Sequence, residues 1–218
     1  MTRARCLLFD LDGTLTDNYE GISRCVLYAL EGTGCDAPDE LALHGCVGPP
    51  LRQSFARLLA TQDGARIESA VARYRDRYSL HGWRENAVYP GIAEALQRLA
   101  DAGNRLFLCT AKPQVYAQRI VTHFGLAPHL SGVHGPDLGG RLDDKRDLMT
   151  TLLARERISP EQCVMIGDRA QDMDAAKVNG VAGLGVLWGY GTREELLSAG
   201  ARQLAARPED LVSALSKF

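Results

Sequence analysis

Two aspartates near the N-terminus, Asp10 and Asp12, are the residue pair in this sequence best suited to chemistry. They follow the apolar run Cys6–Phe9, which predicts a strand buried on both faces. Open α/β sheets bind ligands just beyond the carboxyl ends of such strands. If Leu11 points away, both carboxylates face one crevice at that end. The simpler alternative is a solvated Asp-Gly turn.

Gly13, directly after this pair, permits a tight backbone turn. In such a turn the backbone amides of Leu11 and Asp12 can approach an anion. We therefore expect this segment to bind an anionic group beside two carboxylates.

A second acidic pair, Asp168 and Asp172, follows the apolar run 163–166. Together with Asp10 these residues offer hard oxygen ligands at three positions, which suits Mg²⁺. The alternative interpretation of the pair is structural. A helix N-terminus favours both a capping aspartate and a carboxylate in its first turn.

A hydroxyl and an ammonium group complete the candidate set. Thr110 ends an apolar run, and Lys145 opens a predicted helix 23 positions before Asp168. Lys145 could instead form a surface ion pair with the two aspartates that precede it. Lys112 and Lys177 are alternative candidates for its role.

These residue types fit the hydrolysis of a phosphate monoester. The ester is an anion, so it repels a carboxylate nucleophile until a cation neutralises both. Asp10 would then attack phosphorus and form an aspartyl-phosphate. Asp12 would protonate the leaving alcohol and later activate water. Lys145 and Thr110 would stabilise the phosphoryl oxygens.

The elements that must position these residues alternate between strands and helices from residue 90 onward. Such alternation predicts βαβ units around a parallel sheet, to which the first strand also belongs. We predict strands at 105–109, 163–166 and 181–187, and helices at 91–102, 113–124, 145–157, 170–179, 194–199 and 208–216.

A helical block separates the first strand from this region. Apolar spacing predicts helices over 18–32, 51–60 and 65–78, and no strand within roughly 16–82. The prediction is therefore an α/β fold: a Rossmann-like parallel-sheet core formed by residues 1–15 and 86–218, interrupted by an all-helical cap domain at 16–85.

The composition is that of an ordinary soluble globular protein, with 218 residues, 45% of them hydrophobic, and a net charge of −2. The near-neutral balance gives no attraction to nucleic acid or anionic lipid, so neither is expected as a partner. No apolar run approaches the ~20 residues that span a bilayer. The basic residues 1–5 precede an apolar run too short for a signal peptide. The six cysteines show no C-x-x-C spacing, so we expect free thiols in a reducing cytoplasm.

The motifs occur in an order that resembles the haloacid dehalogenase-like (HAD) hydrolases, in their phosphatase branch. The similar segments are FDLDGTLTD at 9–17, CTAK at 109–112, Lys145, and GDRAQD at 167–172. The resemblance implies a Mg²⁺-dependent phosphoric monoester hydrolase. It implies that the backbone carbonyl of Asp12 completes the metal site beside Asp10, that Asp168 binds directly, and that Asp172 acts mostly through water. It also implies phosphate binding by Leu11, Asp12, Thr110, Ala111 and Lys145.

Two positions depart from this pattern. Arg169 stands where many relatives have Ser or Thr, and it would either contact the nearby carboxylates or point to solvent. Ala111 stands where Asn or Ser is frequent, which leaves its backbone amide as the phosphate donor.

The helical block resembles the C1 type of cap, and the segment 45–55 resembles the cap loop that relatives direct at the active site. In this loop Arg52 is our candidate for binding a carboxylate or second phosphate of the substrate. The alternative is a solvated residue on a helix face.

The segments 88–91, 189–191 and 208–211 agree with the phosphoglycolate phosphatases, but also occur in 5′-nucleotidase-like and pyrophosphatase-like relatives. We expect a small phosphorylated metabolite as substrate, with phosphoglycolate first. A β-phosphoglucomutase-like phosphomutase would use the same Asp10 and Asp12 but return the phosphoryl group to its substrate. A dehalogenase needs neither Asp12 nor the metal-binding residues Asp168 and Asp172. A non-catalytic phosphate-binding module does not need a complete set of nucleophile, acid/base, lysine and metal ligands. The oligomeric state is left open.

Overall fold

The computed structural model describes residues 5–218, which divide into two compact units. One unit contains the chain up to Thr16 together with Val88–Phe218, and the other contains Asp17–Ala87. The predicted cap, 16–85, begins one residue earlier and ends two residues earlier than the second unit. The signal-peptide prediction concerns residues 1–5, of which the first four lie outside the described part of the chain.

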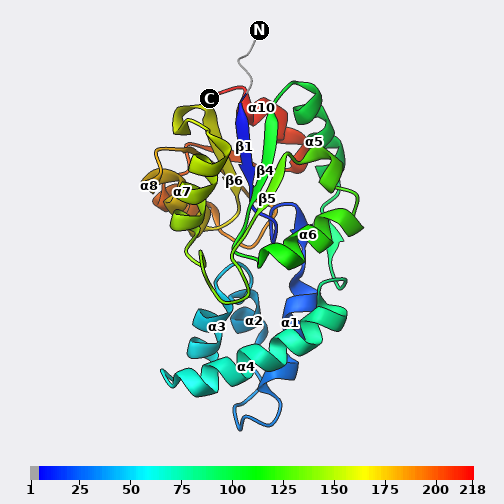
Figure 1. The fold of residues 1–218 in the computed structure, drawn as a ribbon, viewed down its shortest axis with the longest axis vertical. Helices are drawn as coiled ribbons and strands as arrows, with labels where there is room; N and C mark the ends of the chain where they lie inside the picture. The colour runs from blue at the N-terminus through cyan, green and yellow to red at the C-terminus, as the bar shows by residue number, and fades with distance from the viewer. Residues whose placement is uncertain (1–4) are drawn as a thin grey trace. The chain divides into compact units, whose positions relative to one another are not determined.

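A six-stranded parallel sheet forms the centre of the first unit, in the order β5-β4-β1-β6-β7-β8 (Figure 1). Its strands are β1 (Cys6–Phe9), β4 (Arg105–Cys109), β5 (Gly132–His134), β6 (Cys163–Gly167), β7 (Ala182–Val186) and β8 (Gln203–Ala205). All four residues of β1 are buried between neighbouring strands, which explains why its sequence is apolar throughout. The predicted α/β class with a parallel sheet is confirmed.

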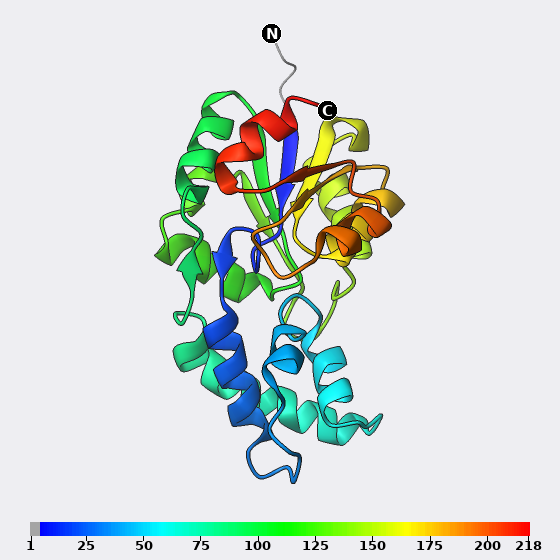
Figure 2. The same cartoon turned by 180° about the vertical axis from the view of Figure 1, so that it is seen from behind.

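Helices cover both faces of this sheet. They are α5 (Ile92–Asp101), α6 (Gln114–His123), α7 (Lys145–Glu156), α8 (Ala170–Val178), α9 (Arg193–Ala199) and α10 (Leu211–Leu215), with short 3-10 turns η2 (Ala127–His129), η3 (Pro160–Gln162) and η4 (Pro208–Asp210). On one face α5 packs against α10, and on the other α7 packs against α8 (Figures 1 and 2). Leu8 and Phe107 of the sheet share a buried core with Leu148 and Leu152 of α7.

The two edge strands, β5 and β8, are not predicted by the sequence pattern. Each has three residues, and two of the three are only half-buried. An edge strand with so few buried positions has no apolar run long enough to indicate it.

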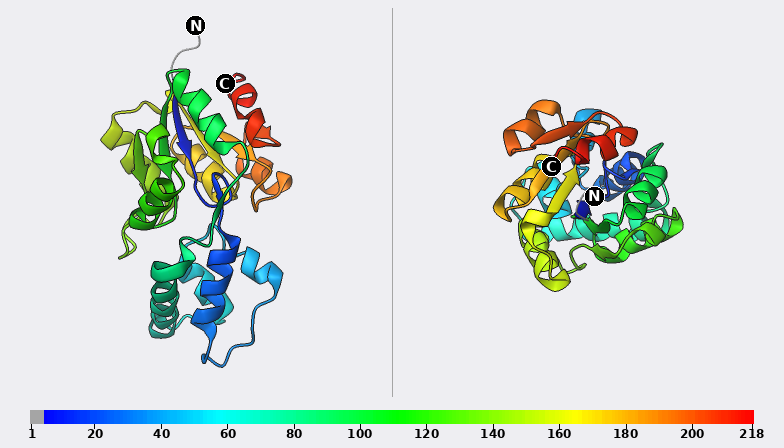
Figure 3. Two further views of the ribbon diagram at one scale, coloured as in Figure 1. Left: turned by 90° about the vertical axis from the view of Figure 1, so that its right-hand side faces the viewer. Right: turned by 90° about the horizontal axis from the view of Figure 1, so that it is seen from above.

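The second unit is built from helices. They are α1 (Tyr19–Leu30), α2 (Glu40–His44), α3 (Leu51–Leu58), α4 (Gly64–Arg77) and the π-helical turn η1 (Tyr78–Gly82). The five-residue α2 is not predicted, and the Asp39 side chain caps it by accepting from the Ala42 amide. Figure 3 shows α1 beside α4, which it contacts. A Cβ on Gly21 of α1 would lie 2.2 Å from the Gly82 carbonyl oxygen, so only glycine permits this approach.

The chain passes between the units through two short strands, β2 (Thr16–Asp17) and β3 (Ala87–Val88), which pair with each other. The expectation of no strand within 16–82 is therefore wrong at Thr16–Asp17. Two residues are too few to produce a recognisable alternation.

All six cysteines are free thiols, and only Cys35 is not buried. Among residues 5–218, no helix has the length and apolar character needed to cross a membrane.

Candidate active site

Three neighbouring strands, β4, β1 and β6, bring predicted site residues together at the carboxyl end of the sheet. Phe9 of β1 is in register with Leu108 of β4 and with Ile166 of β6. The residues that follow these three strand ends therefore converge, as the sheet geometry predicts. The Asp10 amide continues the ladder by donating to the Ile166 carbonyl at 2.9 Å.

The segment after β1 folds into a tight turn around Leu11. The Leu11 carbonyl accepts from the amides of Leu15 and Thr16, and the Leu11 amide donates to Asp10 Oδ1 at 2.8 Å. Gly13 has a φ of +83°, and a Cβ there would lie 2.2 Å from Asp168 Oδ2. Glycine is thus needed both for the backbone conformation and for the space.

Asp10, Asp168 and Asp172 form a buried acidic cluster, in which each offers one oxygen and these oxygens all lie within 4.8 Å of one another. Asp10 is 3% exposed and the other two are fully buried. Burial, followed by the charges of Asp172 and Asp10, raises the pKa of Asp168 to about 8. The surroundings of Asp168 therefore disfavour its charged form.

Lys145, the first residue of α7, supplies one cation to this cluster. Its Nζ lies 3.0 Å from Asp10 Oδ2 and also donates to Asp172 Oδ1. Burial lowers the pKa of this lysine, but the charges of Asp10 and Asp172 outweigh burial and raise it. Asp144 instead caps α7 and pairs with Arg146, so Lys145 belongs to the buried cluster rather than to a surface ion pair.

Lys112, the other buried lysine, contacts a different carboxylate. Its Nζ lies 2.7 Å from Asp12 Oδ2, and its backbone amide donates to Thr110 Oγ1 at 3.2 Å. The two candidate lysines therefore occupy separate positions, Lys145 at Asp10 and Lys112 at Asp12. Lys177, the third candidate, is exposed on α8.

Sequence reasoning missed the residues that hold Asp168. The Thr14 hydroxyl donates to Asp168 Oδ1 at 3.1 Å, and the Tyr190 amide donates to Asp168 Oδ2 at 2.9 Å. A Cβ on Gly191 would lie 1.9 Å from the Asp168 carbonyl oxygen, and one on Gly189 would overlap the turn at Gly13. The Gly-Tyr-Gly sequence was the available signal, because paired glycines indicate close backbone approach.

The charges of this site are not balanced by the protein alone. Asp10, Asp12, Asp168 and Asp172 carry four negative charges when ionised, and Lys112 and Lys145 carry two positive charges. All six side chains are buried. The remainder of −2, with three carboxylate oxygens gathered within 4.8 Å, fits one divalent cation bound by oxygen ligands.

Three other predicted residues, Arg169, Ala111 and Arg52, lie outside the acidic cluster. The side chain of Arg169 donates from Nε to Glu195 at 3.0 Å. Its amide, however, donates to Asp172 Oδ2 at 3.0 Å. Ala111 is half-buried directly after Thr110. Arg52 lies on α3 in the helical unit, where its Nε is 2.5 Å from Glu68.

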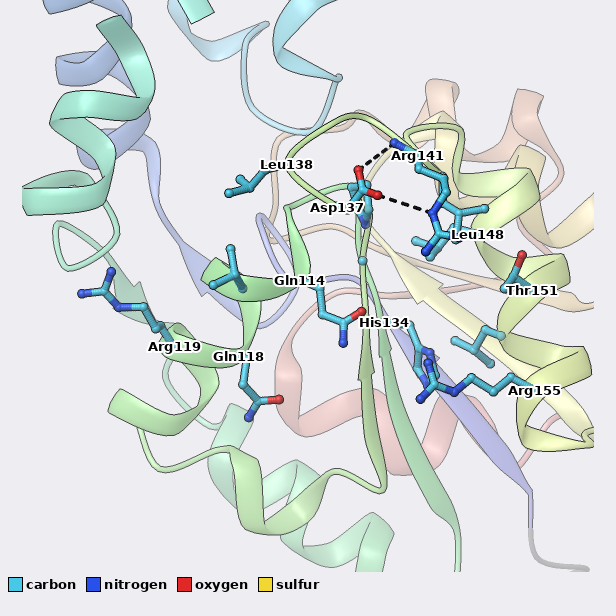
Figure 4. Close-up of a pocket in the computed structure, with 15 residues that line it drawn as sticks. Gln114, Gln118, Arg119, His134, Asp137, Leu138, Arg141, Leu148, Thr151 and Arg155 are labelled. Atoms are coloured by element: carbon cyan, nitrogen blue, oxygen red, sulfur yellow. Dashed lines mark hydrogen bonds and ion pairs between the residues drawn. The ribbon is translucent and has the colours of Figure 1, made fainter. Parts of the chain in front are cut away.

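A separate cavity of about 830 Å³ lies between α6 and α7 at the β5 edge of the sheet (Figure 4). Gln114 and Arg155 project into it from opposite sides, with His134 between them. None of the predicted site residues lines this cavity. It is therefore distinct from the acidic cluster.

Comparisons with known proteins agree with this geometry. A family model described as haloacid dehalogenase-like hydrolase matches residues 7–186. A Pseudomonas aeruginosa protein named 5′-nucleotidase is 44% identical over 190 residues, which cover 87% of this chain and 86% of that protein. A Rhodospirillum rubrum protein named phosphoglycolate phosphatase is 32% identical over 206 residues, or 90% and 85% of the two chains.

A third relative and a solved structure are also similar to this chain. The Mycobacterium tuberculosis protein named tyrosine-protein kinase PtkA is 40% identical over 186 residues, which cover 85% of this chain but 62% of PtkA. The crystal structure of a predicted phosphatase from Clostridium acetobutylicum superposes with a TM-score of 0.95 at 35% identity, covering all of both chains.

Proposed function

Since this chain belongs to the haloacid dehalogenase-like hydrolase family, we propose that it is a Mg²⁺-dependent phosphatase that hydrolyses a small phosphate monoester through an aspartyl-phosphate on Asp10. The observation that carries the proposal is the buried cluster itself. Asp10 and Asp12 lie on one turn, and each contacts a different lysine. Asp10 also lies close to Asp168 and Asp172, and together these three offer oxygen ligands of the kind that bind a metal ion.

In the first step Asp10 attacks phosphorus, and the bond between phosphorus and the ester oxygen breaks. Asp12 gives its proton to the departing alkoxide, so the alcohol leaves neutral. Lys145 stabilises the negative oxygens of the transferred group, and Thr110 with the backbone amides of Leu11, Asp12 and Ala111 donates to them.

In the second step water attacks phosphorus of the aspartyl-phosphate. Asp12, now ionised, takes a proton from this water, and the Asp10 carboxylate leaves as phosphate forms. Both side chains return to their starting states, so one pair of carboxylates serves both half-reactions.

Asp10, the Asp12 backbone carbonyl and Asp168 would hold the Mg²⁺ ion, with Asp172 acting mostly through water. When bound, the ion neutralises the charge shared by the nucleophile and a phosphoryl oxygen. Thr14 and the Tyr190 amide fix both oxygens of Asp168, which keeps this ligand in one orientation.

Nucleoside 5′-monophosphates are the first candidate substrates. The relative named 5′-nucleotidase shares 44% identity with this chain, against 32% for the phosphoglycolate phosphatase. Phosphoglycolate becomes the second candidate. That Arg52 binds a second anionic group of the substrate stays a prediction. To do so, Arg52 would have to release Glu68, with which it forms an ion pair.

The proposal is tested by phosphate release from purified protein with Mg²⁺, over nucleoside monophosphates, phosphoglycolate, sugar phosphates and pyrophosphate. We expect release that stops in excess EDTA and in Asp10→Asn. Isomerised sugar phosphate without free phosphate would favour the phosphomutase alternative. Equal release by Asp10→Asn would overturn the assignment of the nucleophile.

A further inference from the structure

The mechanism above uses one buried lysine, but the site contains two. Lys112 is 8% exposed and Lys145 is 6% exposed. Burying an ammonium group is unfavourable unless the group is paired. An apolar side chain of similar length at position 112 would avoid that cost, so the charge at Lys112 calls for a functional explanation.

An ion pair links Lys112 to the carboxylate of Asp12. The distance from Nζ to Oδ2 is 2.7 Å, and Asp12 is itself only 7% exposed. A charge-assisted contact of this length fixes the torsion angles of a short side chain. Losing this contact would remove one restraint on the rotamer of the Asp12 side chain.

Lys112 is in turn held by a rigid backbone. Its amide donates to Thr110 Oγ1, and the Gln114 amide donates to the Pro136 carbonyl at 2.9 Å. A Cβ on Gly135 would lie 2.4 Å from the Lys112 carbonyl oxygen, so the two backbones are in close contact. The ammonium therefore projects from a fixed point between β4 and α6.

We propose that Lys112 is a positioning residue that holds the Asp12 carboxylate in place for its proton transfers, whereas Lys145 serves the nucleophile. This inference rests on the proposed function, because it assigns Lys112 a role in that reaction. It gives the two buried lysines separate tasks: each stabilises the reactive geometry of one of the two aspartates on the same turn.

A double-mutant cycle tests this most sharply, because residues that act through one another show non-additive effects. The variants are Lys112→Met, Asp12→Asn and the double variant, measured with a nucleoside monophosphate or whichever ester the wild type hydrolyses best. We expect Lys112→Met to lower kcat about 10- to 100-fold, which is less than the roughly 10²- to 10⁴-fold effect of general acid–base catalysis because Asp12 itself remains, and to change KM less than about 3-fold. The double variant should lose no more than Asp12→Asn alone.

Multiplied losses in the double variant, or a rise in KM with unchanged kcat, would overturn the proposal, since both indicate that Lys112 acts independently of Asp12.

Lys112→Arg, which keeps a donor, should recover part of kcat if the variant retains its fold. Lys177→Met carries the same substitution on the exposed face of α8 and should match the wild type. Thermal melting of each variant separates loss of fold from loss of positioning. A wild type without turnover refutes the proposed function, whereas a failed cycle with an active wild type refutes only this inference.

Discussion

Asp168→Asn should stabilise the metal-free protein while abolishing its stabilisation by Mg²⁺. The carboxyl group of Asp168 has an ordinary pKa of 3.8, and burial among like charges raises the pKa to about 8 in the folded chain. A raised carboxyl pKa means that the folded state binds a proton more tightly than the unfolded state. The resulting penalty is absent below pH 3.8, grows as the pH rises, and is complete above pH 8.

The free-energy cost of ionising Asp168 in the folded protein at pH 7 follows from the difference between pH 7 and the pKa of this group in the unfolded chain, 3.8. About three pKa units at 1.36 kcal/mol each give roughly 4 kcal/mol. Asparagine removes this cost but loses one of the two hydrogen bonds from Thr14 and Tyr190, which is worth about 1 kcal/mol or more. The net gain should be about 1–3 kcal/mol, or roughly 2–10 °C in melting temperature for a chain of this size.

The assay is thermal melting in EDTA and in Mg²⁺ at pH 6, 7 and 8, with Asp174→Asn on the exposed face of α8 as the matched control. The wild type in EDTA should lose stability as the pH rises, and Mg²⁺ should restore it by binding only the folded state. In Asp168→Asn the pH slope should flatten and the Mg²⁺ shift should disappear. A variant that melts lower than the wild type in EDTA, or shifts equally with Mg²⁺, would refute the reasoning.

Three more outcomes follow from particular contacts. Glu85 pairs with Arg77 at 2.6 Å, and mainly this hydrogen bond lowers the pKa of Glu85 to about 2. The contribution of the pair to the free energy of unfolding is therefore complete above pH 4.5 and fades toward pH 2. Glu85→Gln should cost about 1–2 kcal/mol in urea unfolding at pH 7 and almost nothing at pH 2; an equal loss at both would contradict the ion pair. Gly13→Ala should abolish phosphate release, because its Cβ would meet Asp168 Oδ2 at 2.2 Å, and normal kinetics would show that the turn is misplaced. Asp12→Asn should slow alkyl phosphates more than aryl phosphates, whereas equal losses would remove the acid role from Asp12.

The strands and helices next to the chemistry were predictable because burial leaves a simple pattern. The run Cys6–Phe9 is apolar at every position, since β1 lies in the middle of the sheet and helices cover both faces. The edge strands β5 and β8 and the short helix α2 escaped prediction for the opposite reason. Each has too few buried residues to impose a periodicity.

The division of labour between the two lysines was not predictable from the sequence. Lys112 follows a predicted strand and Lys145 opens a predicted helix, and neither position assigns its lysine to a particular carboxylate. The contacts that separate them join residues 100 and 135 positions apart, from Asp12 to Lys112 and from Asp10 to Lys145. The register of β1 with β4 brings Asp12 toward Lys112, and the packing of α7 against β4 brings Lys145 to Asp10.

The central claim is that Asp10 becomes covalently phosphorylated during turnover. The direct measurement is mass spectrometry of protein that has been quenched in acid during turnover with Mg²⁺ and substrate, followed by borohydride reduction to locate the acyl phosphate. The account predicts one phosphoryl group on the wild type, a reduced residue at position 10, and no label on Asp10→Asn. A phosphoryl group on any other residue, or steady turnover with no label under conditions that preserve acyl phosphates, would contradict it.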